Sequence, residues 1–244
     1  MSQEGREGKE GKERPQATAS KQTGRHASER LATPASLRPQ FLLETVAALA
    51  IGVAFLGLPD RLTVGPNWLA LAISAAVLLP LLVTALVRPL NHEVARMLRA
   101  SLQVLLTAAL LSSVGLLVTH LGDNDLKNAI GAGGLLRAGA LLWVSNVLIF
   151  SVWYWELDGD GPVHRHQRGH PAADFLFPQQ QGGNLSGWRA GFVDYLFLAF
   201  CSATALSPAD TMPLTRRAKL LMMAEALISI AIIALLVARS VNIL

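Results

Sequence analysis

The fold class is decided by residues 192–244, FVDYLFLAFCSATALSPADTMPLTRRAKLLMMAEALISIAIIALLVARSVNIL. They contain a short apolar segment, 193–206, and a long one, 216–241, separated by a polar interval. A helix needs about 20 apolar residues to cross the hydrocarbon core of a bilayer, so only the long segment is predicted to span a membrane. Pro208 and Pro213 lie in or beside the interval. Because proline disrupts helices, a non-helical break is predicted between the two segments.

Long apolar segments also fill the part of the chain that precedes this stretch. Of all residues, 52% are hydrophobic and only 16% are charged, which is typical of a membrane protein. Four segments have about the length of a membrane span: Phe41–Leu58, Trp68–Val87, Leu98–Thr119 and Leu135–Tyr154. The predicted fold is therefore all-α. It is a polytopic transmembrane helical protein with four spans, a short re-entrant or pore-like helix and a final long helix.

Two polar regions complete the predicted domain organisation. Residues 1–40 contain no Phe, Trp or Tyr and carry eight Lys/Arg and five Glu. They cannot bury enough apolar surface to fold, so a disordered tail is predicted there. Residues 156–191 form the longest polar stretch between apolar segments and are predicted to be a loop. The four-helix transmembrane region is then 41–155, and the pore-helix-like segment with the last span is 192–244.

Lysine and arginine residues are distributed unevenly between the two sides of this topology. The tail, the connection between the second and third spans, and the loop 156–191 fall on one side, which carries most of the positive charge. Cytoplasmic loops of membrane proteins are enriched in Lys and Arg, so the N-terminus and this loop are predicted to be cytoplasmic, in an inner (plasma) membrane. The net charge of +4 follows from this asymmetry, and no nucleic-acid partner is predicted beside the lipid bilayer.

Residues 192–244 resemble the pore half of potassium channels, in which a short pore helix leads into a T-V-G-Y-G-D filter, a proline and a lipid-spanning inner helix. The resemblance places a filter-like region at Thr204, Ala205, Leu206, Ser207, Pro208, Ala209 and Asp210, where only Asp210 keeps the filter signature. A potassium filter binds the ion with successive backbone carbonyls, and its glycines adopt backbone angles that are costly for other residues. Because Ser207 and Ala209 replace those glycines, the segment is predicted to be pore-like without potassium selectivity.

The chain is also similar to a family of uncharacterised bacterial multi-pass membrane proteins. The similarity is carried by motifs within residues 150–244: WYWELDGDGP, DFLFPQ, DYLFLAF, TALSPADTMPL and AKLLMMAEALISIAIIALLVARSVNIL. It implies a helical fold in a bacterial plasma membrane, and it implies no particular activity.

Glu225 is the main candidate for a functional side chain inside the predicted spans. It lies ten residues after Thr215, near the predicted bilayer midplane, where a carboxyl group is costly and often functional. Ser229 lies on the same helix face. A structural explanation stays open, in which Arg137 or Asn146 satisfies the carboxyl group. Thr215 itself is placed to cap the last helix with its hydroxyl.

Residues 153–191 contain two motifs that have both a functional and a structural interpretation. His164, His166 and His170 are weak candidates for a metal site, since their spacing matches no defined metal motif and a solvated basic loop also explains them. WYWELDGDGP is interpreted as aromatic residues at the membrane interface, followed by Asp-Gly turns. The sequence contains no enzyme or nucleotide-binding motif, so neither catalysis nor a cofactor is predicted.

These features predict an integral membrane protein of unknown substrate that is ion channel-like or conduction-related. A pore built from one loop and one helix per chain needs several copies, so a homo-oligomer and a permeating ion are the expected partners. Two alternatives stay open: a non-conducting structural or regulatory membrane protein, and a proton- or solute-coupled transporter that uses Glu225.

Overall fold

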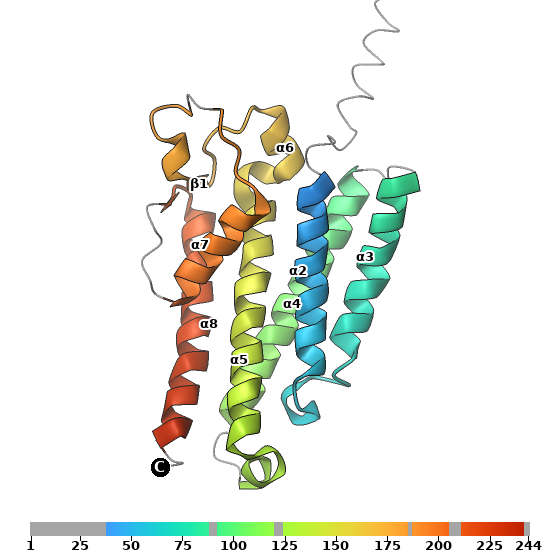
Figure 1. Ribbon diagram of the computed structural model, residues 1–244, viewed down its shortest axis with the longest axis vertical. Coiled ribbons are helices and arrows are strands. Elements are labelled where there is room, and N and C mark those ends of the chain that lie inside the picture. Colours follow the sequence, from blue (N-terminus) through green and yellow to red (C-terminus); the bar gives the residue numbers. More distant parts are fainter. Residues whose placement is uncertain (1–37, 88–91, 120–123, 185–186, 205–210, 242–244) are drawn as a thin grey trace, which may run out of the picture. The chain divides into compact units, whose positions relative to one another are not determined.

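The structure is a computed structural model that describes residues 38–87, 92–119, 124–184, 187–204 and 211–241. All of them belong to one compact unit, Thr33–Leu244. Six long helices dominate this part of the chain (Figure 1): α2 (Arg38–Leu56), α3 (Leu69–Val87), α4 (His92–Thr119), α5 (Asn124–Leu157), α7 (Phe192–Thr204) and α8 (Arg216–Val241). The predicted helical fold is confirmed.

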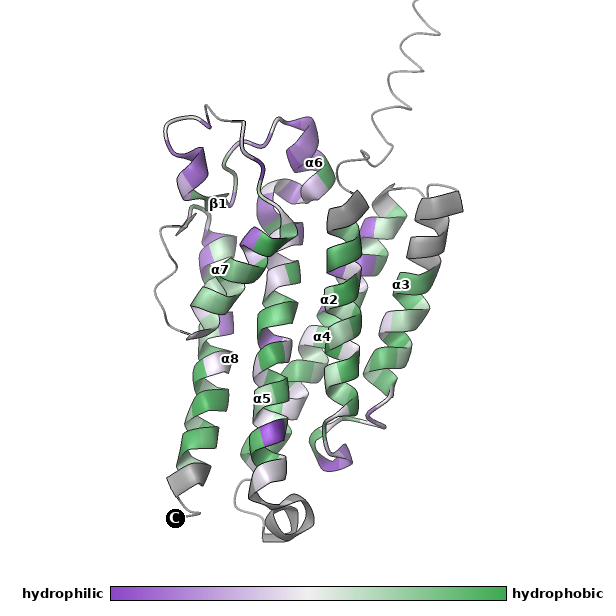
Figure 2. Cartoon of the chain, viewed as in Figure 1, coloured by the Kyte–Doolittle hydropathy of each residue, from purple (hydrophilic) through white to green (hydrophobic). Residues whose placement is uncertain are grey.

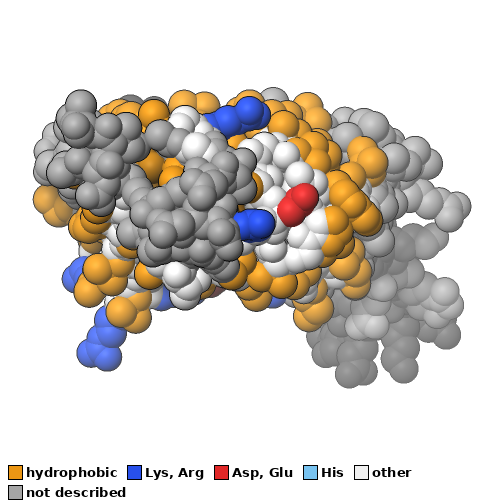
Figure 3. All heavy atoms as spheres, turned by 90° about the horizontal axis from the view of Figure 1, so that it is seen from below, with side chains coloured by type: hydrophobic (Ala, Val, Ile, Leu, Met, Phe, Trp, Pro, Cys, Tyr) orange, Lys and Arg blue, Asp and Glu red, His pale blue; other side chains and the backbone are white. Residues whose placement is uncertain are grey.

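Three helical segments in the described residues are long and apolar enough to cross a membrane: Val94–Thr119, Gly133–Asp160 and Arg216–Ala238. The apolar stretches of α2 and α3, Phe41–Leu56 and Leu69–Leu79, are shorter. A membrane protein is therefore confirmed, while the predicted count of four spans is not. Apolar residues cover the helices along their length, and polar residues gather at one end (Figure 2). At the opposite end, apolar side chains surround a few charged ones (Figure 3).

The polar end of the bundle is formed by residues 158–191, which we call the cap. It contains η4 (Asp158–Asp160), α6 (Pro162–Gln167), β1 (Phe175–Leu176) and η5 (Pro178–Gln180). Gly159 and Gly161 have φ angles of 60° and 100°, a region that glycine enters at little cost, so the predicted Asp-Gly turns are present. The prediction of a solvated basic loop is wrong. The cap is folded, and one of its arginines, Arg165, is only 1% exposed.

Helix α8 begins at the cap. The short strand β2 (Met212–Pro213) pairs antiparallel with β1, so that Phe175 lies opposite Pro213. Thr215 follows, and its Oγ1 accepts a hydrogen bond of 3.3 Å from the Ala218 amide. This is the hydrogen bond predicted to cap the N-terminus of the last helix, and it is confirmed.

Helix α7 also begins at the cap, because it follows the cap directly at Phe192. With 13 residues it is about 20 Å long, which is less than the hydrocarbon thickness of a bilayer. Near its end, the Ala203 carbonyl accepts a hydrogen bond from Ser229 Oγ, about halfway along α8. The chain is back at the cap by Met212. Helix α7 therefore extends partway along α8, while Met212 and β2 lie back at the cap end (Figure 1).

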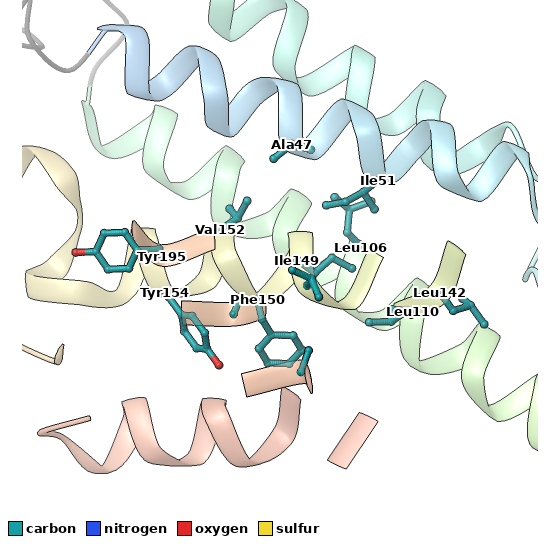
Figure 4. Close-up of a cluster of buried hydrophobic side chains, with 14 of the residues drawn as sticks. Ala47, Ile51, Leu106, Leu110, Leu142, Ile149, Phe150, Val152, Tyr154 and Tyr195 are labelled. Carbon is teal, nitrogen blue, oxygen red and sulfur yellow. The ribbon is translucent and has the colours of Figure 1, made fainter. Parts of the chain in front are cut away.

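A buried apolar core joins α2, α4 and α5. Figure 4 shows Ile51 of α2 close to Leu106 of α4 and Ile149 of α5, and all three side chains are at most 2% exposed. On α4 the buried leucines recur at intervals of about one helical turn, as at Leu102, Leu106 and Leu110, so one face of this helix is buried.

Two predicted boundaries differ from the structure. Helix α2 begins at Arg38, within the predicted tail, and the remainder of the tail lies outside the described residues. The fourth span was predicted to begin at Leu135, but α5 begins at Asn124. Gly131, with a φ of 62°, interrupts α5 in the GAGG segment, 131–134.

Gly52→Ala is expected to destabilise the protein by about 1–3 kcal/mol. A Cβ atom at this position of α2 would lie 2.8 Å from the Leu71 Cα on α3, so the two helices would have to separate. Gly115→Ala is the matched control, since no atom lies within 4 Å of its Cβ position and alanine is favoured inside a helix by about 0.5–1 kcal/mol. Thermal unfolding in detergent measures both variants. Equal stabilities would contradict the close packing of α2 against α3.

Candidate functional site at the cap end of helix α5

Consecutive residues at the cap end of α5 contact different parts of the protein. Trp153 Nε1 donates a hydrogen bond of 2.9 Å to Thr107 Oγ1 on α4. Tyr154 contacts α8, and Trp155 contacts the cap, and both side chains are 0% exposed. Their interpretation as an aromatic belt at the membrane interface is therefore wrong. Because successive helical residues point about 100° apart, this one stretch can connect three neighbours.

The guanidinium group of Arg165, in the cap, stands close to two aromatic rings that contact each other, one on α5 and one on α7. It stands 4.8 Å from the ring centroid of Trp155 and 5.1 Å from that of Tyr195. Its Nη1 donates hydrogen bonds to the backbone carbonyls of Asp158, at 2.6 Å, and Trp155, at 3.3 Å. These contacts offset part of the free energy that burying a positive charge costs.

The carboxylate of Asp158 balances the buried charge of Arg165. Its Oδ1 accepts hydrogen bonds from the backbone amides of Asp174, at 2.8 Å, and Phe175, at 3.2 Å. Its Oδ2 accepts one from the Tyr195 hydroxyl, at 2.5 Å, and lies 3.7 Å from Arg165 Nη1. This single carboxylate therefore joins the end of α5 to α6, β1 and α7.

Asp174 is a second buried carboxylate and connects the cap to the start of α8. Its two oxygens accept hydrogen bonds of 2.7 Å each from Arg217 Nε and Nη2, which form a bidentate pair. Thr215 Oγ1 donates another bond of 2.6 Å, and the Gly159 amide one of 3.0 Å. Burial by itself would raise the pKa of Asp174, but these hydrogen bonds outweigh it and hold the pKa below its usual value. Asp174 is therefore ionised at neutral pH.

Glu225 lies about 14 Å from the start of α8, and its side chain is completely buried. The Tyr154 hydroxyl donates a hydrogen bond to Glu225 Oε2. Glu225 Oε1 has no hydrogen-bond partner among the described residues. The carboxyl group is thus held from one side, in the interior between α5 and α8.

Asn146 and Ser229 lie beside Glu225, and their hydrogen bonds go to partners other than its carboxyl group. Asn146 Nδ2 donates a hydrogen bond of 3.2 Å to the Glu225 backbone carbonyl. Ser229 Oγ accepts a bond of 2.9 Å from Trp143 Nε1 and donates to the end of α7. These bonds tie α5, α7 and α8 together around the buried acid.

Arg137 is not the partner of Glu225. It lies 17 residues before Tyr154, which places it about 25 Å away along α5. Its side chain is exposed and lies close to Gly57, at the end of α2. The hypothesis that Arg137 satisfies the carboxyl group is therefore wrong.

The three histidines of the cap do not meet at one point with acidic residues. His166 Nδ1 and His170 Nε2 lie 3.2 Å apart. Burial, followed by the nearby charges of Arg165, His166 and Arg189, lowers the pKa of His170 to about 4, so this ring is neutral at physiological pH. Like the rest of the described residues, the cap contains no group of three or more side chains able to hold a metal ion. His164 lies on α6 with His166 and belongs to no such group among the described residues.

Most of the filter-like region, residues 205–210, lies outside the described residues. Thr204 is described and ends α7, where its hydroxyl donates a hydrogen bond of 2.8 Å to the Phe200 carbonyl. This contact is local to the last turn of the helix.

Tyr154, Asp158, Arg165 and Asp174 were not predicted from the sequence to be functional. The available signal was the position of charged residues directly beside aromatic ones in WYWELDGDGP and DFLFPQ. A charged residue beside aromatic residues is fully buried only when a residue of opposite charge or a hydrogen-bonding group pairs with it. Here those partners come from distant parts of the chain.

The fold and these contacts define a helical membrane protein with a folded polar cap and a buried acid on its last helix. Comparisons of this chain with models of protein families, with curated proteins and with solved structures find no match.

Proposed function

We propose that the protein conducts protons or small cations across the plasma membrane and that the permeating ion meets Glu225. The observation that carries this proposal is the buried carboxyl group of Glu225, whose Oε1 has no hydrogen-bond partner among the described residues. A carboxyl group inside an apolar helix is costly, and such residues commonly mark ion pathways or proton relays.

The course of α7 and α8 supports the proposal. A half-length helix that begins at the cap end of the bundle, with β2 back at that end and a long apolar helix after it, fits a re-entrant pore segment. In the proposed topology, α2 to α5 are four spans, α7 re-enters from the cap side and α8 is the last span. The N-terminus and the cap lie in the cytoplasm, as the distribution of Lys and Arg favours.

A shared pore requires several copies of the chain. The outward side of α8 carries large exposed apolar residues, such as Leu220, Leu227 and Ile230, which are 58% to 66% exposed and suit contact with lipid or another copy. The replacement of the filter glycines further supports a pore without potassium selectivity. A strictly monomeric protein in mild detergent contradicts the shared pore.

The Glu225→Gln variant tests the proposal. Reconstituted wild-type protein is expected to carry protons or monovalent cations into liposomes without preferring potassium to sodium, and the variant is expected to lose this flux. Asp60→Asn is the matched control, because it makes the same acid-to-amide change at an exposed residue outside the long helices. Both variants should unfold at a temperature close to that of the wild type. Unchanged flux in a folded Glu225→Gln variant refutes the role of Glu225.

A non-conducting structural role is the second candidate. The complete burial of Glu225 and its hydrogen bond from Tyr154 favour it, since they also suit a protonated acid that only packs the helices together. The absence of flux in folded wild-type protein would support this role. A coupled transporter is distinguished from both by flux that requires a second solute gradient.

A further inference from the structure

A second acidic cluster lies where α2, α4 and α5 meet at the cap end of the bundle, and it consists of Glu44, Arg99 and Glu156. Glu44 on α2 is 4% exposed. The side chains of Arg99 on α4 and Glu156 on α5 are each 18% exposed, and Arg99 Nε lies 3.5 Å from Glu156 Oε1. Glu44 interacts electrostatically with both of them. The guanidinium group of Arg99 also stands 4.7 Å from the ring centroid of Phe41, which fixes its position.

The charges of this cluster do not balance when both acids are ionised. Two carboxylates and one guanidinium leave one negative charge in a largely buried place, and an uncompensated buried charge costs several kcal/mol. Trp155, which also interacts with Glu44, is neutral. Within this cluster, one carboxylate is therefore left without a balancing positive charge.

Three buried polar atoms of the cluster also lack a hydrogen-bond partner among the described residues. They are Glu44 Oε2, Glu156 Oε1 and Arg99 Nε. Arg99 Nε and Glu156 Oε1 are close enough to form an ion pair, but they are not oriented to form a hydrogen bond. A group that neutralises one carboxylate and donates a hydrogen bond would balance the charge and give the two carboxyl oxygens a partner.

We propose that Glu44 and Glu156 share one exchangeable proton and that this cluster is a proton-binding site, separate from Glu225. The proton joins the two carboxyl groups through a hydrogen bond and leaves a single negative charge, which Arg99 balances. This inference does not depend on conduction through Glu225 of α8, because it concerns two other acids, Glu44 of α2 and Glu156 of α5.

A proton fits this cluster better than a metal ion does. Hard cations such as calcium and magnesium take about six or more oxygen ligands, whereas two carboxyl groups are the acidic ligands here. The described residues contain no group of three or more metal-ligating side chains. The guanidinium group of Arg99 would also repel a metal ion, whereas a proton already bound between two carboxylates needs no further ligand.

The partial exposure of Glu156 connects the site to the cap side of the protein. We expect the proton to exchange with that side through Glu156, because it is the more exposed of the two acids. Release of the proton restores the unbalanced charge between α2, α4 and α5, so the packing of these helices is coupled to the pH on the cap side.

The test is infrared difference spectroscopy of the full chain in lipid nanodiscs, recorded between neutral and alkaline pH. We expect one carboxylic acid carbonyl band to be lost as the pH rises, with release of one proton per chain from this site. Glu44→Gln and Glu156→Gln should each remove the band completely, because neither acid holds the proton alone. Glu225→Gln and Asp60→Asn should leave it unchanged.

The pH of proton release in the Arg99→Gln variant distinguishes proton binding from a purely structural role of the cluster. Removing the positive charge disfavours the ionised pair, so the pH of proton release should shift upward. Survival of the band in folded Glu156→Gln protein overturns the sharing of the proton, since Glu44 would then be protonated by burial alone. Absence of the band from the wild type also overturns the proposal. A release pH that depends on sodium at constant ionic strength overturns the proton in favour of a metal ion.

Discussion

Asp158→Asn is expected to lower the free energy of unfolding by about 3–5 kcal/mol, the cost of removing one partner from a buried ion pair. Asparagine has nearly the size and shape of aspartate, so the loss reports on charge and hydrogen bonding. Arg165 would keep its positive charge while 1% exposed, without the carboxylate that now balances it. The amide group would also meet three donors, from Tyr195 and two backbone amides, with a single acceptor oxygen.

Asp160→Asn is the matched control two residues further along the chain. The Asp160 side chain is 45% exposed, and its contacts with Arg168 and Arg217 are 3.6 Å and 3.4 Å long. Exposed ion pairs contribute at most about 1 kcal/mol, so this variant should remain close to the wild type. Thermal unfolding in detergent, followed by tryptophan fluorescence, compares the two. Equal losses would show that Asp158 does not hold the cap together.

Trp155→Ala is expected to destabilise the protein by about 3–5 kcal/mol, as is usual for a large aromatic residue removed from a core. The indole ring is completely buried. It packs edge-on against Phe41 of α2, at 6.5 Å between centroids, and against Tyr195 of α7, at 5.6 Å. It also supports the guanidinium group of Arg165. The substitution therefore removes contacts between α2, α5, α7 and the cap at once.

Trp68→Ala is the control for Trp155→Ala, because Trp68 is 56% exposed and should change stability by no more than about 0.5 kcal/mol. Trp155→Phe should recover part of the loss, since phenylalanine keeps an aromatic ring in the same place. Near-ultraviolet circular dichroism at 25 °C checks that tertiary packing around the remaining aromatic residues is kept. A stability of Trp155→Ala equal to that of Trp68→Ala would contradict the central position of this ring.

Much of the helical framework was predictable from the sequence. The last helix was expected over 216–241 and is found at Arg216–Val241, with Thr215 as its N-terminal capping residue. The short helix was expected over 193–206 and is found at Phe192–Thr204. Apolar run length, proline positions and capping residues are local signals, and each acts within a few residues of the chain.

The partners of the buried charged residues were not predictable in the same way. Tyr195 and Asp158 are 37 residues apart in the chain, and Arg217 and Asp174 are 43 apart. The HRHQRGH segment and the Asp-Gly turns have the composition of an exposed loop, and the sequence analysis interpreted them so. Arg165 is buried in the cap against Asp158, Trp155 and the distant Tyr195, and the distant pair of Asp174 with Arg217 joins the cap to α8, contacts that composition does not reveal.

The sequence by itself determined that this is a helical membrane protein with a half-length helix before its last long helix, and that Glu225 interrupts an apolar segment. These properties follow from the free energy of placing apolar and polar residues in lipid, which depends on the local run of residues. Only the tertiary structure decided that Tyr154, and not Arg137, contacts Glu225, and that Glu44 meets Glu156 and Arg99. Such pairs depend on how helices rotate and pack against one another, and that arrangement minimises the free energy of the whole bundle.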